Sequence, residues 1–194
     1  MTTFLHHMRR CLFLLLMAIP LTALAEIKIE SGKTYYITCN QNTAGYVALG
    51  ANHGSSFLMT YVLGNTPAND GYWIITKDGN GYTIRNAASQ EYVSWYSQRD
   101  TYKNMILTSD VEDDSQRWTF EEYNGSIIIR NVGNDAYIWN TRRNGQVAGY
   151  TNTDYNDTNS QYNIFDQDGN NVITGESGGG GNTDPDDNPD DDQI

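Results

Sequence analysis

The sequence contains very little cysteine: Cys11 and Cys39 are the only two among 194 residues. Cys11 belongs to an N-terminal segment that export would remove, so the mature chain would keep one cysteine and could form no internal disulfide. Small secreted domains without an adequate core usually depend on disulfides. This chain must instead rely on its core, and the roughly 150 residues from Glu26 to Thr174 are enough to build one domain.

Long apolar runs are also missing, apart from one near the N-terminus. Residues 11–23 are apolar and follow Arg9 and Arg10, and small residues at 23 and 25 precede the charged Glu26. This run is too short to span a bilayer comfortably, and its flanks are typical of a secretory signal peptide. We therefore expect a signal peptide over residues 1–25, no membrane span, and a secreted, extracellular protein.

Basic residues are few and form no stripe. The chain has 12 Lys and Arg against 24 Asp and Glu. Because nucleic-acid binding requires a basic surface for the phosphate backbone, we expect no nucleic-acid partner. Seven of the acidic residues lie in residues 175–194, a stretch of Gly, Asp, Asn and Pro without an aromatic residue. This composition predicts a disordered tail or linker after a domain at residues 26–174.

The chain does contain an internal repeat with a period of about 45 residues. Trp73 lies 45 residues before Trp118, and Asn163 lies 45 residues after it. Each copy also contains a strand-like segment, which reads TYYITCN, GYTIRNA and SIIIRNV in turn. A third recurring position is a tyrosine, and it is occupied by Tyr46, Tyr92 and Tyr137.

Glycine-containing turns recur at corresponding places, at residues 78–81, 124–125 and 168–169. Alternating runs of Tyr, Val, Ile, Thr and Trp between such turns are typical of β-hairpins, and no helical periodicity follows the N-terminal segment. The predicted class is all-β. Three copies are too few for a propeller, which needs about four blades at least, whereas three copies of about four short strands fit a β-trefoil.

Two of these copies carry a short motif. Residues 116–118, Gln-Arg-Trp, resemble the Gln-any-Trp signature of the ricin-type β-trefoil lectins, and residues 161–163, Gln-Tyr-Asn, resemble a degenerate copy of it. The first copy, residues 71–73, keeps only the tryptophan. The resemblance covers about residues 31–170 and implies a β-trefoil in which the tryptophan is a core residue and the glutamine ties the backbone around it. It also implies a carbohydrate-binding module.

Sugar sites of that family usually combine an aspartate two places after the tyrosine column, an aromatic platform further along, and an amide just before the glutamine. The aspartate positions hold Ala48, Ser94 and Trp139 here, and the amide positions hold Asp70, Ser115 and Ser160. None of these has the family's residue. We therefore expect binding of a glycan or polysaccharide to depend on aromatic stacking with nearby amides.

Strand alternation predicts that Val47, Val93 and Ile138 point inward and that Trp139 points outward. The third subdomain has the densest set of rings and hydrogen-bonding groups, and the second has a smaller set. The predicted carbohydrate-binding residues are Trp139, Asn140, Arg142, Tyr150, Tyr155, Trp95 and Tyr96. An alternative is that Tyr150 and Tyr155 only cap the barrel beside a solvated loop.

Groups suited to catalysis or metal binding are few. A weak hydrolase would need His53, the one histidine of the mature chain, or a carboxylate pair chosen from Asp110, Glu112, Asp113 and Asp114. The segment 166–170 begins like a calcium loop but has Ser177 where the final glutamate belongs, and it aligns with the other turns. We expect no catalytic residue, no metal site and no cofactor.

A protein-binding trefoil, such as a protease inhibitor, is the alternative to a carbohydrate-binding module. Its contact would be a single exposed loop, and residues 60–69, which include Pro67, are the candidate. We expect a monomer.

Overall fold

The structure is a computed structural model that describes residues 25–40, 45–49, 58–61, 69–95, 105–142, 145–151 and 155–174. Residues 1–24 and 175–194, which hold nearly all of the expected signal peptide and the whole expected tail, lie outside these ranges. The described residues form strands and three short 3-10 helices, η2 (Asn69–Gly71), η3 (Asp114–Gln116) and η4 (Thr158–Ser160). The predicted all-β class is confirmed.

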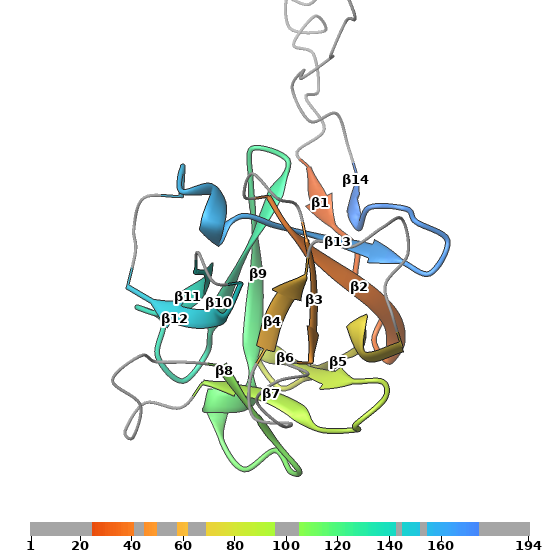
Figure 1. The fold of residues 1–194 in the computed structure, drawn as a ribbon, viewed down its shortest axis with the longest axis vertical. Helices are drawn as coiled ribbons and strands as arrows, with labels where there is room; N and C mark the ends of the chain where they lie inside the picture. Colours follow the sequence, from red (N-terminus) through yellow and green to blue (C-terminus); the bar gives the residue numbers. More distant parts are fainter. Residues whose placement is uncertain are drawn as a thin grey trace, which may run out of the picture.

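Three consecutive sets of four strands make up the fold (Figure 1). The first subdomain contains β2 (Lys33–Cys39), β3 (Gly45–Leu49), β4 (Leu58–Tyr61) and β5 (Tyr72–Asp78). The second contains β6 (Gly81–Asn86), β7 (Tyr92–Trp95), β8 (Met105–Thr108) and β9 (Trp118–Tyr123). The third contains β10 (Ser126–Asn131), β11 (Ile138–Thr141), β12 (Val147–Tyr150) and β13 (Tyr162–Asp166).

The first and last strands of each subdomain close a barrel. Antiparallel pairing runs from β2 to β5, β6, β9, β10, β13 and back to β2, so the ring of strands has no open edge. The remaining strands form the hairpins β3–β4, β7–β8 and β11–β12, which contact one another. A closed barrel with three such hairpins is a β-trefoil, as the sequence predicted. The short strands β1 (Glu26–Ile27) and β14 (Ile173–Thr174) pair with each other beside the barrel (Figure 1).

Tight turns lie where the sequence predicted them. Gly79 has a φ of 58° between β5 and β6, and Asn124 and Gly125 have φ of 50° and 81° between β9 and β10. Two successive residues with positive φ form the turn whose twist matches that of the flanking strands, which explains the Asn-Gly sequence there. Gly169 after β13 also has a positive φ, of 85°.

The tryptophan column is the centre of the core. The indole Nε1 of Trp73 donates to the carbonyl oxygen of Val47 at 2.7 Å, and that of Trp118 donates to the carbonyl of Val93 at 3.1 Å. In the third copy, Tyr162 takes this place, because Ile127 pairs with Tyr162 as Tyr82 pairs with Trp118. Tyr162 is buried, burial raises the pKa of its hydroxyl well above the usual value, and that hydroxyl bonds to the Thr141 hydroxyl at 2.9 Å.

The prediction that Asn163 continues the tryptophan column is therefore wrong by one residue. The 45-residue period does not hold for the third copy. Tyr162 follows Trp118 by 44 positions, so this copy has one residue fewer between β10 and β13. Asn163 points the other way, and its side-chain amide donates to Asn40 Oδ1 at 2.6 Å.

The prediction that Trp139 points outward is also wrong. Arg85 pairs with Tyr92 and Arg130 pairs with Ile138, so the connection before β11 is one residue longer than the connection before β7. Ile138, and not Tyr137, consequently occupies the tyrosine column. Trp139 takes the inward position of Val93, has no exposed surface and belongs to the main core cluster.

Inward-facing residues of the other two copies were predicted correctly. Val47 and Val93 are fully buried in the core cluster. Ile138 is buried too, but it lies on the opposite face of β11 from Trp139 and outside that cluster, because side chains alternate along a strand.

Candidate functional site: the rim of the third subdomain

The signature glutamine is a structural residue. Gln116 Oε1 accepts from the backbone amides of Glu112 and Asp113 at 3.3 and 3.0 Å, and Gln116 Nε2 donates to the Asp110 carbonyl at 3.4 Å. Asp113 caps η3 in return, accepting from the Ser115 amide at 2.7 Å. The glutamine ties the loop before β9 into a fixed shape, as the family resemblance implied.

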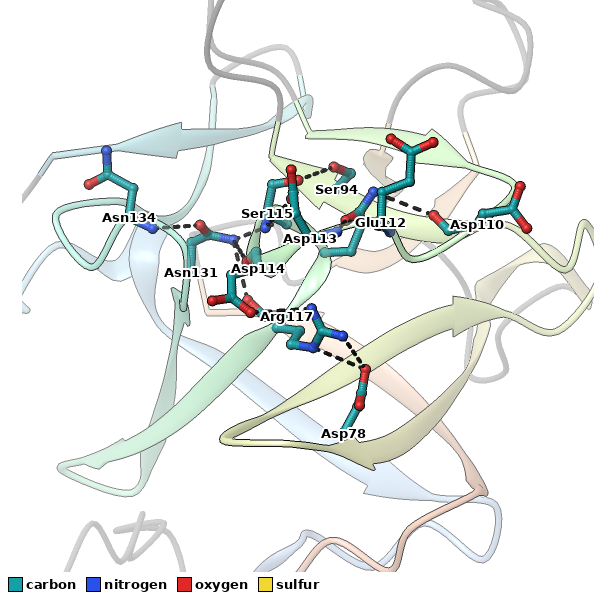
Figure 2. A network of polar contacts seen from close by, with 11 residues as sticks. Asp78, Ser94, Asp110, Glu112, Asp113, Asp114, Ser115, Arg117, Asn131 and Asn134 are labelled. Carbon is teal, nitrogen blue, oxygen red and sulfur yellow. Dashed lines mark hydrogen bonds and ion pairs between the residues drawn. The ribbon is translucent and has the colours of Figure 1, made fainter.

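The rim of the second subdomain is occupied by contacts of its own (Figure 2). Arg117 bonds to Asp78 on the neighbouring hairpin at 2.9 Å and to Asp114 at 3.2 Å. The Asn131 side-chain amide donates to the Ser115 carbonyl at 2.9 Å. These bonds hold η3 against the barrel and give Asp113 and Asp114 structural roles, so two of the four carboxylates considered for a hydrolase pair are used within the fold.

The family's aspartate position in the second subdomain is closed. Ser94 is buried, and its hydroxyl lies 3.1 Å from the hydroxyl of Ser115, which holds the amide position (Figure 2). In the first subdomain, the corresponding Ala48 is buried and has no polar side-chain atom. Neither rim therefore offers a polar side chain at the aspartate position that could reach a sugar.

The third subdomain differs once the strand register is corrected. The aspartate position falls on Asn140 instead of Trp139, and the amide position falls on Asn159 instead of Ser160, because Tyr162 and not Asn163 aligns with Trp118. Both positions thus carry side-chain amides. The sequence-based alignment is therefore wrong at the amide position, where Asn159 has the family's residue type, whereas the aspartate position holds Asn140 and still has no aspartate.

These two amides meet at one carboxylate. Asn140 Nδ2 donates to Asp157 Oδ2 at 3.1 Å and to the Ser160 hydroxyl at 2.9 Å. Asp157 Oδ1 accepts from the backbone amide and from the Nδ2 of Asn159, at 3.0 and 2.9 Å. Asp157, Asn140 and Asn159 are all partly exposed, so this group, called here the rim triad, faces solvent at the edge of the barrel.

An exposed ring lies on the same face as the triad. Tyr150 pairs with Ile138 in the β11–β12 hairpin, and Ala148 pairs with Asn140, so Tyr150 is the diagonal neighbour of Asn140. The side chain of Tyr150 is 52% exposed, the largest exposure among the big hydrophobic side chains that the structure describes. Arg142 is partly exposed and lies two residues beyond Asn140 on that face.

The remaining predicted site residues make other contacts or lie outside the described residues. Trp95 is 7% exposed and stacks on Tyr137 with ring centroids 4.2 Å apart, so it is a packing residue. Tyr155 is partly exposed, and its hydroxyl donates to Glu121 Oε2 at 3.0 Å. Tyr96 lies outside the described residues. The structure therefore brings together Asn140, Arg142 and Tyr150, and it places Trp139 and Trp95 in the interior.

Sequence reasoning missed Asp157 and Asn159. Asp157 could have been recognised as an N-cap, because an aspartate at the start of a short turn commonly accepts a hydrogen bond from the backbone N–H two residues later. Its side chain caps η4 as Asp113 caps η3, which is a signal that the two turns are equivalent. That equivalence would have corrected the alignment of the third copy.

Among the described residues, no group of three or more His, Cys, Asp or Glu side chains is arranged to hold a metal ion. No described helix is long and apolar enough to cross a membrane. His53 and residues 62–68 of the suggested inhibitor loop lie outside the described ranges. Cys39 is buried, and its thiol points toward the carbonyl oxygens of Thr158 and Asn159, at 3.7 and 3.8 Å.

A cavity of about 410 Å³ lies elsewhere, between β1, the start of β2 and the turn after β13. Its principal carboxylate, Asp166, accepts hydrogen bonds from Asn170 and from the Asp168 amide, and the Asn170 side chain lowers the pKa of Asp166. Its tyrosine, Tyr35, bonds to the backbone of Glu30. These two polar groups of the cavity are thus already used within the fold. We take the rim triad as the candidate site because Asn140 and Asn159 lie at the family's polar positions.

Comparison with solved structures gives the same fold. A ricin B-like lectin of Macrolepiota procera in complex with lactose is 16% identical, with a TM-score of 0.58 over 71% of this chain and 97% of that one. A Polyporus squamosus lectin bound to Neu5Acα2-6Galβ1-4GlcNAc is 20% identical, with a TM-score of 0.59 over 72% of this chain and 50% of that one.

An endo-β-galactosidase of Clostridium perfringens that releases GlcNAcα1-4Gal is 13% identical, with a TM-score of 0.58 over 68% of this chain. This chain spans only 31% of that enzyme, and 17% of a mosquitocidal holotoxin of similar fold. No family model and no curated protein matches the sequence. At these identities the comparisons define the class of fold: the chain is a β-trefoil of the kind seen in ricin B-like lectins.

Proposed function

We propose that this protein is a secreted, monomeric carbohydrate-binding module whose sugar site is the rim triad of the third subdomain together with Tyr150. The carrying observation is that Asn140 and Asn159 occupy the two polar positions of a ricin-type site and converge on Asp157. The fold shared with lectins crystallised with lactose and with a sialylated trisaccharide is consistent with this role.

The chemistry of the triad suits sugar hydroxyls. Each carboxylate oxygen has two lone pairs, and Asp157 Oδ2 accepts one hydrogen bond from Asn140, so it retains capacity for a hydroxyl donor. Side-chain amides supply both donors and acceptors, which matches the hydroxyl groups on neighbouring sugar carbons. A charged acceptor strengthens such bonds relative to a neutral one.

Tyr150 would supply the apolar part of the contact. Sugar rings have C–H faces, and tyrosine combines an apolar ring with a polar end and loses little conformational entropy on binding. Its exposed position beside Asn140 leaves room for a sugar ring to lie against it. We assign no catalytic step to the site.

The test is a printed glycan array probed with the mature chain and with two variants. Asn140→Ala should abolish the array signal, and Tyr150→Ala should weaken it by about five- to 150-fold, by analogy with base stacking on rings. Tyr72→Phe, which removes a hydroxyl on the first subdomain, is the matched control and should bind as wild type. An array on which the wild-type chain binds nothing would overturn the proposal.

A further inference from the structure

A polar cluster on the outside of the barrel lies next to the rim triad. It joins Glu121 of β9, Arg130 of β10 and Tyr155 of the segment that leads into η4. Glu121 pairs with Ile128 in the β9–β10 hairpin, which makes Arg130 its diagonal neighbour on the same face. The side chains of Arg130 and Glu121 are 19% and 38% exposed, so these contacts are partly shielded from solvent.

The three side chains all bond to one another, and Arg130 Nη1 also donates to the carbonyl oxygen of Asp135. Arg130 donates through Nε to Glu121 Oε1 and through Nη2 to Glu121 Oε2, the latter at 3.2 Å. Arg130 Nη2 also donates to the Tyr155 hydroxyl, which in turn donates to Glu121 Oε2 at 3.0 Å. A forked pairing of guanidinium and carboxylate fixes direction as well as distance. We call this set of three residues the clasp.

The clasp holds one end of the segment that carries the triad. The Tyr155 ring packs edge-on against Tyr123, with centroids 5.3 Å apart, and the Tyr123 hydroxyl donates to Asn156 Oδ1 at 3.0 Å. The Tyr155 carbonyl accepts from Gln161 Nε2 at 2.7 Å, which closes the segment on itself. Asp157 lies within this segment and directly follows Tyr155 and Asn156, the two residues held by these contacts.

The fold itself does not require a clasp. Arg85 of β6 is at the position of Arg130 of β10, but Thr76 of β5 stands at the place of Glu121 of β9, and the Arg85 guanidinium lies over the Tyr92 ring at 5.8 Å instead. The barrel closes equally well at that position. The extra ion pair and the extra hydrogen bond of the Tyr155 hydroxyl therefore occur next to the rim triad, whose exposed polar side chains need a fixed geometry.

We propose that Glu121, Arg130 and Tyr155 are positioning residues for the third-subdomain site, holding Asp157 and Asn159 in the geometry that a glycan meets. The inference rests on the proposed function for its ligand. The ordering of Asp157 and Asn159 by the clasp is a property of the chain without ligand and can be tested separately. Rigid support lowers the entropic penalty of ordering a site on binding, so a loose segment should bind more weakly with the same contact groups.

The experiment compares Arg130→Gln and Tyr155→Phe with Arg85→Gln, the matched change on the second subdomain. Amide hydrogen exchange of the unliganded mature chain is followed by NMR at Asn159, whose amide donates to Asp157 Oδ1. The Ser115 amide, which donates to Asp113 Oδ1, is the internal reference. Each variant is then applied to the same glycan array as the wild-type chain.

Both clasp variants should accelerate exchange at Asn159 by about tenfold and leave Ser115 unchanged, since they remove one or two hydrogen bonds from that segment. Array binding should fall about three- to tenfold, with Arg85→Gln indistinguishable from wild type. Unchanged exchange at Asn159 in Tyr155→Phe, which keeps the ring and any folding role of Arg130, would overturn the positioning role. If the wild-type chain binds no array glycan, the proposed function fails, and the exchange data still decide whether the clasp orders the segment.

Discussion

The indole of Trp95 lies directly against the backbone of Gly149. A Cβ atom built on Gly149 would be 2.6 Å from Trp95 Nε1 and 2.8 Å from its Cδ1, closer than real Cβ contacts. Trp95 is itself fixed by stacking on Tyr137. The contact joins the tip of the β7–β8 hairpin to β12 and so couples the second and third subdomains.

Gly149→Ala should therefore destabilise the domain by about 1 to 3 kcal/mol, the usual range for overpacking a filled core. Urea denaturation measures the change. The double variant Gly149→Ala with Trp95→Phe should recover part of the loss, because the smaller ring leaves room for the methyl group. A Gly149→Ala variant as stable as wild type would show that the ring moves aside without strain.

Trp139→Ala should destabilise the domain by about 3 to 5 kcal/mol, as removal of a buried tryptophan side chain does. The reason is its position in the core, where its ring meets Trp118 and Tyr162 edge-on with centroids 5.5 and 5.7 Å apart. Thermal or urea unfolding of the variant gives the comparison. Tyr150→Ala is the contrasting control, since its exposed ring should cost little stability. A Trp139→Ala variant as stable as wild type would restore the outward orientation.

The sequence was sufficient for the fold because the features that specify it are local. Asn124-Gly125 predicts its turn from backbone chemistry, and Trp73 and Trp118 mark equal positions in strands with the same alternation. These two tryptophans lie one repeat of 45 residues apart, which made the period visible in the sequence. The β-trefoil follows from three such copies whatever the precise length of each connection.

The site could not be placed in the same way because its position depends on register. A one-residue change of register moves every side chain of a strand to the other face. Tyr137 and Ile138 are both good strand residues, so the sequence does not reveal that the connection before β11 has one residue more. Trp139 was for that reason placed outside, and the family's aspartate position was assigned to Trp139 instead of Asn140.

Asn140→Asp should lower stability at neutral pH, because a second carboxylate would then lie beside Asp157 where an amide now donates at 3.1 Å. Two adjacent carboxylates raise the pKa of one of them, so the loss should diminish as the pH falls and that group takes up a proton. Urea unfolding at pH 7 and pH 4 tests this, with the exposed turn change Asn80→Asp as the control. The exchange variant Asn140→Asp with Asp157→Asn should regain stability at pH 7. A pH-independent deficit would contradict the contact.

Acid should weaken the clasp through Glu121. The Arg130 guanidinium, and then the Tyr155 hydroxyl, hold the pKa of Glu121 below its usual value. A carboxyl group whose folded pKa is depressed adds stability above its unfolded pKa, and that stability is lost as the pH falls through the folded pKa. The unfolding free energy of the wild-type chain should thus fall more steeply below about pH 4.3, the unperturbed value for glutamate, than that of Glu121→Gln. Other carboxyl groups titrate equally in both chains, so parallel curves would mean that Glu121 gains nothing from Arg130.

The three rims predict a single sugar site for each chain. Ala48 has no polar side chain, Ser94 is buried against Ser115, and among the described residues only the third rim has side-chain amides at both of the family's polar positions, where they bond to the Asp157 carboxylate. Isothermal titration with an array-positive glycan should therefore give one equivalent bound per chain. Asn140→Ala should remove that binding completely, without a weaker residual site.

A monomer with a single site cannot cross-link surfaces, so the proposed function predicts that the mature protein binds glycan-coated beads without agglutinating them. Size-exclusion chromatography at the concentration of the bead assay should give a monomer. A deliberately dimerised form, made by fusing two copies through a flexible linker, should agglutinate the same beads, because two linked sites act together when the linker spans them. Agglutination by the monomeric wild-type chain, or binding of two or more equivalents, would show that the first or second rim also takes a sugar and that the closed appearance of Ser94 and Ser115 is not maintained in solution.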